Sequence, residues 1–411
     1  MRKHDMVDRF KKVICTVLVI LISQVTFANE QVSNDKSSAT QKTHAQKYYY
    51  KGIPVLVLSG ASQDMGYEYG LQLKQQLSAV LGILKDYYIG QKHLTYDALV
   101  NYADLLYDRY PENFQTFLQA VAQGSRLSFS DVKILNAMET LGELLEPQEV
   151  QACAFLYIPP SKTTSGSGLI GRNYDFPAPF DQLAKYLTVV VLKETNTVPT
   201  AIISIAGEVY CPSCVNANGV FMELNSGSPS GGHVVKLNTE SMLIRMLATL
   251  QKSSSLSDTL YQLNNVQSDF SFIVNAADKS VPLSFEYSTN PALGMNYYFP
   301  DSSKGFTVTN FYLHPVWGDK IPTPTDDATW MGVTRRNNLI HLSEQTPKFD
   351  IPSFQKLMST DISAGGAAWS MTIYQIIFDE NDYSLYLRIT DSHPNSWVKI
   401  PLKPLFGDMH V

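Results

Sequence analysis

Hydrophobic and polar residues follow two different patterns along the chain, and the change falls near residue 150. In the first part, apolar residues recur at helical intervals in DMGYEYGLQLKQQLSAVLGILKDYYIG and in ENFQTFLQAVAQG, behind one short apolar strand, IPVLVLSG. The second helix is predicted to end near Gly124, and Ser128 with Asp131 predicts the start of a third. This part is therefore expected to be mainly helical.

The second part has the pattern of short strands that are often apolar on both faces, as expected for sheets between other layers. Two pairs of helices are predicted to interrupt them, TESMLIRMLATLQ with SLSDTLYQLNN and VTRRNNLIHLSEQ with IPSFQKLMST. The pattern predicts an α+β layered fold. The predicted strands are ACAFLYI, GLIGRNYDF, LTVVVLK, TAIISIAG, GVFMELN, FSFIVNAA, PLSFEYS, GFTVTNFY, MTIYQIIFD and YSLYLRI.

The N-terminus has the layout of a secretory signal peptide. Basic residues precede an apolar run from Val13 to Phe27 that is short for a membrane-spanning helix. We expect cleavage after Ala28, so that residues 1–28 are removed and no stable membrane span remains; an uncleaved anchor is the alternative. The mature protein is then expected to be secreted or periplasmic, or to lie in a lysosome-type lumen in a eukaryote.

Composition limits the classes of partner. The chain has 411 residues, 44% of them hydrophobic, and a formal net charge of −6 without a long basic run. This charge argues against nucleic acid as a partner and favours a small molecule. Residues 29–47 are polar and are predicted to form a disordered linker before the helical part.

Three cysteines remain once Cys15 leaves with the signal peptide. In an oxidising compartment Cys211 and Cys214 can pair as a disulfide, which leaves Cys153 as the odd thiol. The CPSC spacing also occurs in thioredoxin-like redox pairs. Such a pair belongs at the start of a helix in a βαβ unit, whereas CPSC is predicted to join two strands.

Cys153 stands at the boundary between the helical and the strand-rich part. A cysteine there can be a small buried hydrophobic residue, and Arg172 with Asp175 on the next predicted strand can be an ordinary ion pair. No histidine lies in a pattern that suits a Cys-His pair. If the bond before Cys153 is cut, the new α-amino group, with an ordinary pKa of about 7.7 to 8.0, can serve as base for the thiol. Asp175 would hold the amine and Arg172 would favour the thiolate.

Two asparagines at strand ends, Asn225 and Asn310, are candidate donors to the oxyanion of a tetrahedral intermediate. Asparagine in such a place can also be only a turn residue. The sequence has neither a metal-binding spacing of His and Cys nor a Gly-rich phosphate loop between a strand and a helix. No cofactor and no metal are therefore expected.

One ordered set of motifs resembles the N-terminal nucleophile (Ntn) amidases: Cys153, GRNYD, NANGVFMELNSG, TVTNFY, TRRNNLIHL and MTIYQIIFDENDYSLYLR. The chain is most similar to their penicillin acyltransferase branch (acyl-CoA:6-aminopenicillanate acyltransferase-like). That branch is related to choloylglycine hydrolases, acid ceramidase-like amidases and N-acylethanolamine amidase. The segment before the cysteine resembles it too, in VLVLSGASQDMGYEYGLQL and AVAQGSRLSFSDVKILNAMETL, so the resemblance spans about residue 50 to the end.

The resemblance implies an αββα sandwich, made as a precursor that cuts itself between Ala152 and Cys153. Residues 48–152 would form a helical propeptide, or α subunit, that stays associated with residues 153–411, the catalytic β subunit. The family usually has Thr or Ser after the nucleophile, where Ala154 stands here, and more often Gly before the bond that is cut. The residues that match the family's catalytic positions are Cys153, Arg172, Asp175, Asn225, Asn310 and Arg335, with Arg336 as the alternative to Arg335.

The expected function is that of a cysteine amidase that hydrolyses a linear, non-peptide C–N amide through a thioester. Two alternatives keep the same fold: acyl transfer to an amine acceptor, and a binding protein that never processes. Aromatic residues in DFPAPF, NFYLHPVW and MNYYF are candidates to line an apolar acyl pocket, although aromatics in a sandwich more often belong to the core.

Overall fold

The computed structural model describes residues 44–145, 152–177, 179–301, 303–390 and 396–407. The predicted signal peptide, its cleavage site and most of the predicted linker lie outside these residues. Within them, no helix combines the length and the apolar character that crossing a membrane would require.

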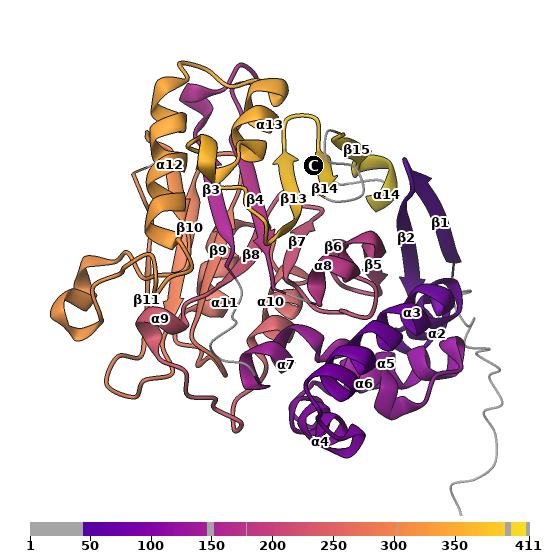
Figure 1. Ribbon diagram of the computed structural model, residues 1–411. Coiled ribbons are helices and arrows are strands. Elements are labelled where there is room, and N and C mark those ends of the chain that lie inside the picture. The colour runs from indigo at the N-terminus through magenta and orange to yellow at the C-terminus, as the bar shows by residue number, and fades with distance from the viewer. Residues whose placement is uncertain (1–43, 146–151, 178, 302, 391–395, 408–411) are drawn as a thin grey trace, which may run out of the picture. The chain divides into compact units, whose positions relative to one another are not determined.

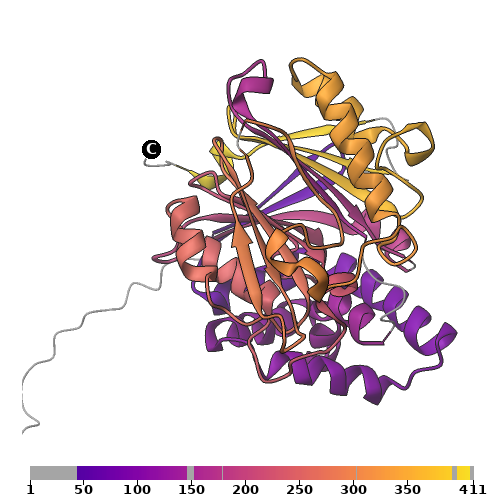
Figure 2. The same ribbon diagram turned by 90° about the vertical axis from the view of Figure 1, so that its left-hand side faces the viewer.

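Two β-sheets form the centre of the fold, and helices cover their outer faces (Figures 1 and 2). The strands β2 and β5 are parallel, and the other neighbouring pairs are antiparallel. The nine-stranded sheet contains, in spatial order, β1 (His44–Tyr50), β2 (Ile53–Gly60), β5 (Leu187–Glu194), β6 (Thr200–Ile205), β7 (Ser213–Asn216), β8 (Phe221–Ser226), β9 (Phe272–Ala277), β10 (Pro282–Tyr287) and β11 (Met295–Tyr298). The six-stranded sheet contains β12 (Phe306–Val308), β3 (Ala154–Ile158), β4 (Leu169–Asp175), β13 (Thr372–Asp379), β14 (Ser384–Ile389) and β15 (Val398–Pro401).

The helices form the two outer layers. The helices are α2 (Ser62–Gln72), α3 (Lys74–Lys85), α4 (Tyr96–Tyr107), α5 (Glu112–Ser125), α6 (Phe129–Asn136), α7 (Met138–Leu145), α8 (Phe180–Leu183), α9 (Ser228–Gly231), α10 (Met242–Leu250), α11 (Leu256–Leu263), α12 (Gly332–Gln345), α13 (Ile351–Ser359) and α14 (Lys403–Phe406), with short turns η1 (Asp86–Gln91), η2 (Pro160–Lys162), η3 (Ala184–Tyr186), η4 (Pro315–Lys320) and η5 (Ile362–Ala364). The helices α12 and α13 pack on the six-stranded sheet, and α2 and α10 contact the nine-stranded sheet. The predicted α+β sandwich is thus the observed architecture.

The strand β3 shows why its sequence is apolar without alternation. Leu156 and Ile158 pack against Met358 of α13, on the outer side of the sheet. Because successive side chains of a strand point to opposite faces, Cys153 and Phe155 belong to the other core, which faces the nine-stranded sheet. Both faces of β3 are therefore buried, and Cys153 lies between the two sheets.

Most predicted elements are confirmed. All ten predicted strands and the four helices predicted in the second part are present. The helix α5 ends at Ser125, where Arg126 adopts a left-handed conformation with φ 62°. The hydroxyl of Ser128 caps α6 by accepting from the Asp131 N–H, as the sequence predicts.

Three predictions were wrong in detail. The linker predicted to reach residue 47 ends sooner, because β1 begins at His44 and pairs along its length with β2. An edge strand needs backbone partners on one side only, so its polar sequence gives a weak signal. The long helix predicted near Leu73 is two helices, since ψ of Leu73 is 10°. The CPSC run does not simply join strands, because Cys214 lies within β7.

Candidate active site

Cys153 directly precedes β3, and its side chain is fully buried at 0% exposure. Nη2 of Arg172, on the neighbouring strand β4, donates to its Sγ at 3.3 Å. Burial raises the pKa of the Cys153 thiol to about 11; the Arg172 charge lowers it, and the charges of Asp175 and Glu223 raise it. In the uncut chain the thiol is therefore neutral near pH 7.

The guanidinium of Arg172 has hydrogen-bond acceptors at both Nη atoms and a carboxylate beside Nε. Nη1 donates to the carbonyl of Pro212 and to the hydroxyl of Ser213, the latter at 2.5 Å. Nη2 donates to the carbonyl of Leu224 at 2.7 Å in addition to the thiol. Nε lies 3.2 Å from Oε2 of Glu223 in a fully buried ion pair, without the alignment of a hydrogen bond. One Nη2–H is thus left to face the sulfur.

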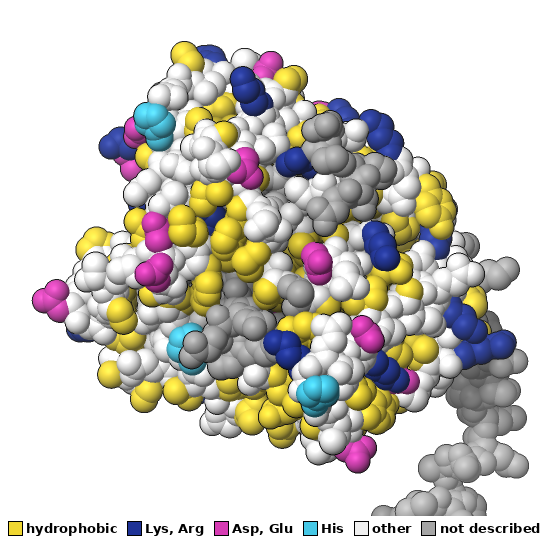
Figure 3. Space-filling model, viewed as in Figure 1, with side chains coloured by type: hydrophobic (Ala, Val, Ile, Leu, Met, Phe, Trp, Pro, Cys, Tyr) yellow, Lys and Arg dark blue, Asp and Glu magenta, His cyan; other side chains and the backbone are white. Residues whose placement is uncertain are grey.

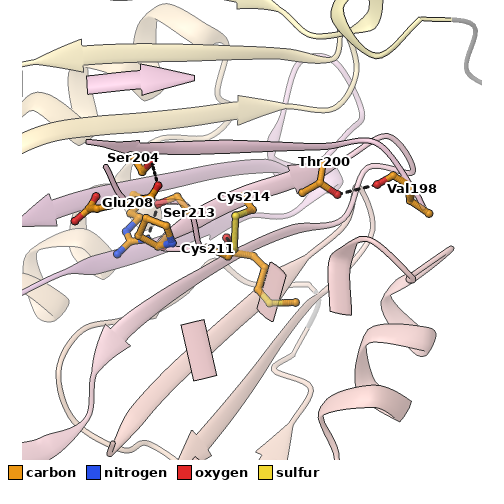
Figure 4. Close-up of a disulfide and its surroundings, with 10 residues drawn as sticks. Val198, Thr200, Ser204, Glu208, Cys211, Ser213 and Cys214 are labelled. Atoms are coloured by element: carbon orange, nitrogen blue, oxygen red, sulfur yellow. Dashed lines mark hydrogen bonds between the residues drawn. A yellow bond between two sulfur atoms is a disulfide. The ribbon is translucent and has the colours of Figure 1, made fainter. Parts of the chain in front are cut away.

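A disulfide brackets two of these acceptors. Cys211 and Cys214 form the bond, with Cα atoms 5.5 Å apart, and Ser213 lies beside it (Figure 4). Pro212 and Ser213, which lie between the two half-cystines, both accept from Nη1 of Arg172. The disulfide therefore fixes the backbone that holds Arg172.

The peptide unit before Cys153 is held on two sides. The Ala152 N–H donates to the backbone carbonyl of Asp175 at 3.0 Å. The Ala152 carbonyl accepts from Nη1 of Arg335 at 3.1 Å, and the same nitrogen lies 3.0 Å from both the Cys153 carbonyl oxygen and Oδ2 of Asp175. Burial raises the pKa of Asp175 to about 6, although Arg335 and the Thr372 hydroxyl, which donates at 2.6 Å, lower it.

The two asparagines connect the ends of β8 and β12. Asn225 Nδ2 donates to the carbonyl of Thr309 at 3.0 Å, and Asn310 Nδ2 donates to the carbonyl of Ser226 at 3.1 Å. Oδ1 of Asn310 accepts from Nη2 of Arg335 at 2.8 Å. These reciprocal bonds bring both amides to the edge where Cys153 lies, because Val308 pairs with Phe155.

The two neighbouring arginines have different surroundings. Arg335 contacts Ala152, Cys153, Asp175 and Asn310 in this one site. The neighbouring Arg336 instead donates from Nε to the carbonyl of Thr307 at 3.1 Å. All six predicted site residues are thus brought together, with Arg335 rather than Arg336 among them.

The segment before Cys153 contacts the loop that follows β6 of the nine-stranded sheet. The hydroxyl of Tyr69 on α2 accepts from the Gly207 N–H at 2.8 Å, and Oδ1 of Asn136 on α6 accepts from the Val209 N–H at 3.0 Å. Both contacts hold the loop that leads to Pro212, an acceptor for Arg172. The first part of the chain therefore buttresses the backbone that positions this arginine.

Sequence reasoning missed two residues of the site. Glu223 is a single acidic residue in the otherwise apolar run GVFMEL, which is the signal that could have identified it. Thr372 opens a predicted strand and donates to Asp175. Both partners of each contact are distant in sequence, so spacing alone does not reveal them.

Two of the predicted aromatic runs have different surroundings. In DFPAPF, Phe176 and Phe180 belong to the core, with ring centroids 4.0 Å apart. In NFYLHPVW, the side chains of Tyr312, His314 and Trp317 line an open cavity of about 440 Å³. Tyr312 follows Asn310 by two residues in the sequence. Of these two runs, the second is therefore the one that lines an open cavity.

Two of the described histidines contact residues other than Cys153. The ring of His314 packs on Tyr298, with centroids 5.2 Å apart, and His341 contacts Gln345. Among the described residues, no group of three or more His, Cys, Asp or Glu side chains has an arrangement that could hold a metal ion.

No family model matches the chain, and no curated protein matches its sequence. Among solved structures it is similar to a mutant of the conjugated bile acid hydrolase from Clostridium perfringens, with a TM-score of 0.43 and 12% identity, over 62% of this chain and 94% of that chain. It is similar to a Caenorhabditis elegans ortholog of N-acylethanolamine-hydrolyzing acid amidase, with a TM-score of 0.40 and 13% identity, over 56% and 96%. For the penicillin V acylase from Agrobacterium tumefaciens, the TM-score is 0.40 and the identity 11%, over 58% and 82%.

Proposed function

We propose that the chain is a cysteine amidase that activates itself by cutting the bond between Ala152 and Cys153 and then hydrolyses a linear, non-peptide C–N amide. The surroundings of that bond carry the proposal. Its carbonyl oxygen lies 3.1 Å from Nη1 of Arg335, and the adjacent thiol accepts from Arg172. A thiol next to a carbonyl with a cationic donor is the arrangement that an N-to-S acyl shift needs.

The cutting step is an intramolecular acyl transfer. Sγ of Cys153 attacks the carbonyl carbon of Ala152, the C–N bond breaks, and the thiol proton passes to the new α-amino group. Water then hydrolyses the thioester, which leaves a carboxylate on Ala152 and a free amine on Cys153. Arg335 stabilises the oxyanion of the tetrahedral intermediate.

Turnover uses the new amine as base. The amine takes the thiol proton, the thiolate attacks the substrate carbonyl, and the proton then passes to the departing amine. Water, deprotonated by the same α-amine, hydrolyses the acyl thioester. Arg172 favours the thiolate, Asp175 anchors the ammonium form, and Asn225 and Asn310 donate to the oxyanion. No step requires a histidine, a metal or a cofactor.

The two chains that result would stay associated. The strands β1 and β2 belong to the same sheet as β5, and β2 pairs with β5 from Val55↔Val189 to Gly60↔Glu194. Cutting before Cys153 leaves these hydrogen bonds in place. Residues 48–152 would therefore remain as a retained subunit beside residues 153–411.

The substrate we propose is a small amide with an apolar acyl group. Tyr312 and Trp317 line the cavity described above and follow the oxyanion candidate Asn310 closely in the sequence, which supports an apolar or aromatic group. On the face in Figure 3, basic and acidic side chains are interspersed and hydrophobic side chains gather near the middle. A mixed surface of this kind favours a small molecule over nucleic acid as the partner.

A secreted or periplasmic location is part of the same proposal. The basic and apolar layout of residues 1–28 supports it. The Cys211–Cys214 disulfide is a second support, because disulfides persist mainly in oxidising compartments.

A non-processing binding protein is the second candidate, and one observation favours it. The thiol of Cys153 is fully buried, and burial raises its pKa to about 11 in the uncut chain, so it is a poor nucleophile there. This candidate predicts that iodoacetamide leaves Cys153 unlabelled in folded protein at every stage after purification.

The deciding experiment is intact-mass analysis with N-terminal sequencing of the purified protein. The proposal expects two chains, the second beginning at Cys153, and a single uncut chain for Cys153→Ala. Processed protein is then assayed on a panel of fatty acyl amides, bile-salt conjugates, acyl-homoserine lactones, penicillins and small peptides. Adding an amine acceptor and measuring the ratio of hydrolysis to aminolysis separates an amidase from an acyltransferase. An uncut wild-type chain would refute the proposal.

A further inference from the structure

A row of buried polar residues crosses the nine-stranded sheet. Ser213 on β7 is paired with Glu223 on β8, Glu223 with Asn275 on β9, and Asn275 with Ser284 on β10. Residues paired in register point to the same face of a sheet. All four are 0% exposed. The row therefore forms one polar line perpendicular to the strands.

Hydrogen bonds join most of this row and direct it at one side chain. Ser284 Oγ donates to Oδ1 of Asn275 at 2.8 Å, and Asn275 Nδ2 donates to Oε1 of Glu223 at 2.6 Å. The other oxygen of Glu223 lies 3.2 Å from Nε of Arg172, and Ser213 Oγ accepts from Nη1 of the same guanidinium. The polar row of one sheet thus ends at the arginine that the other sheet presents to Cys153.

Such a row is costly if its only role is structural. Burying a charged pair stabilises a fold less than apolar packing of the same volume, because both ions lose water. The neighbours of Glu223 on β8, Met222 and Leu224, are apolar and fully buried, as expected for a core strand. The carboxylate is therefore an exception that its contact with Arg172 has to explain.

Resting on the proposed function, we infer that Glu223 is a positioning residue for the thiol: it fixes the guanidinium of Arg172 so that one Nη2–H faces Sγ of Cys153, and its negative charge limits how strongly Arg172 favours the thiolate. An arginine has five N–H donors in a rigid plane. Glu223, with Pro212, Ser213 and Leu224, surrounds the remaining donors, so the plane cannot turn away from the sulfur.

The charge of Glu223 and its positioning of Arg172 should affect the reactivity of Cys153 in different ways. Besides Arg172, the charges that act on the thiol are Asp175 on β4, Glu223 on β8 and Arg335 on α12. In processed protein the α-amino group of Cys153 is a further one, and it is common to all the variants compared. Burial raises the pKa of Glu223 to about 7, although Arg172 and the Asn275 amide lower it, so its carboxylate is mostly charged above that pH. Removing this charge leaves Arg172 less compensated in that range, which should lower the pH at which the thiol ionises. Loosening the guanidinium should instead lower the reactivity of the thiolate once it has formed.

The test measures the rate of iodoacetamide alkylation of Cys153 against pH in processed protein. Glu223→Gln should move the midpoint of the profile to lower pH by about one unit, the low end of the shift that a nearby charge produces. It should also lower the plateau several-fold, because glutamine replaces one carboxylate oxygen with an NH2 group, which would face the N–H of either Arg172 or Asn275. Thr188→Val, which removes a buried hydroxyl that bonds to Ser204 in the same sheet, is the matched control and should leave the profile unchanged.

A double variant separates charge from position. With Glu223→Gln and Asn275→Asp together, the glutamine oxygen faces Arg172, its amide donates to the new carboxylate, and the hydrogen-bonded row is restored with the charge one residue farther away. We expect the plateau to recover while the midpoint stays below that of the wild type. Ser213→Ala removes an acceptor of Nη1 without a change of charge, so it should lower the plateau and leave the midpoint in place.

The outcomes are distinguishable from failure of the proposed function. If the wild-type chain is not cut, as intact mass reports, the proposed function fails and this inference falls with it. If the wild type is cut and alkylated but Glu223→Gln gives the wild-type profile, the inference alone is overturned. Where Glu223→Gln does not fold by circular dichroism, the double variant and Ser213→Ala decide: unchanged plateaus in both would refute the positioning role.

Discussion

Nη1 of Arg335 lies 3.1 Å from the carbonyl oxygen of Ala152, although the two residues are 183 positions apart in the sequence. The helix α12 carries the arginine to the bond that precedes Cys153. The contact is present in the uncut chain, where the oxygen still belongs to an intact peptide bond. On the proposed mechanism, Arg335 therefore acts in processing, before any substrate is bound.

Replacing Arg335 with lysine should slow processing by about 10²- to 10³-fold, the loss found when a donor to an oxyanion is removed. An ammonium group is a compact charge without the fixed planar geometry of a guanidinium. It therefore cannot donate in the same way to the carbonyls of Ala152 and Cys153 and to the Asp175 carboxylate. The measurement is the fraction of cut chain over time by intact mass. Arg336→Lys is the matched control, since Arg336 bonds to Thr307 instead, and it should process at the wild-type rate. Equal rates for the two variants would remove Arg335 from the mechanism.

Much of the fold could be predicted because the buried strands have strong local patterns. Strand β3 is apolar on both faces since it lies between α13 and the nine-stranded sheet. The edge strands gave weak signals. All four residues of β11 are only partly buried, and β1 carries a polar sequence that pairs through its backbone. Edge pairing is satisfied by main-chain groups, so it leaves little trace in the sequence.

The sequence indicated those residues of the candidate site that lie close together along the chain, and it did not indicate those that come together only through the packing of the two sheets. Cys153, Arg172 and Asp175 lie on neighbouring strands joined by a hairpin, so their spacing is informative. Glu223 acts on Arg172 from the other sheet, and the contact depends on how the two sheets stack. No periodicity in the sequence encodes that stacking, which is why a lone acidic residue in an apolar strand was the only sign.

Thermal stability should fall as the pH rises from about 4.5 to 7, and Glu286 offers a test. Burial raises the pKa of Glu286 from an ordinary 4.5 to about 7, although the N–H groups of Leu313 and Trp317 lower it. The folded state therefore binds more protons than the unfolded state in this window. The contribution of Glu286 to stability is full below the ordinary pKa of 4.5 and is lost as the pH rises through the folded-state pKa of about 7.

The measurement for Glu286 is the melting temperature at several pH values for the wild type and Glu286→Gln. The variant has no group to titrate at this position, so its stability should depend less steeply on pH, even if glutamine lowers the melting temperature overall. The titration of Glu286 should change the free energy of unfolding by about 3 kcal/mol at most across this pH range. Parallel curves for the two proteins would show that Glu286 does not titrate in this range.

Replacing both Cys211 and Cys214 with serine should lower the free energy of unfolding by about 2 kcal/mol, because the closed loop is short. The effect on the reactivity of the Cys153 thiol should be larger than this loss implies, since Pro212 and Ser213 between the two positions hold Arg172. Chemical denaturation gives the first quantity and the alkylation rate of Cys153 the second. Full thiol reactivity in a destabilised variant would separate the disulfide from the site.

The last prediction concerns the crossing of α2 and α5, which fixes the segment before the cysteine. A Cβ atom on Gly124 would lie 2.0 Å from the carbonyl oxygen of Tyr67, which is backbone and cannot move aside. Gly124→Ala should therefore destabilise the protein by about 3 kcal/mol, at the upper end of overpacking effects. Gly82→Ala is the matched control, because Gly82 is exposed in α3 with no atom within 4 Å of the new Cβ. That variant should gain up to about 1 kcal/mol from helix propensity. Thermal unfolding measures both, and a neutral Gly124→Ala would mean that the two helices do not approach so closely.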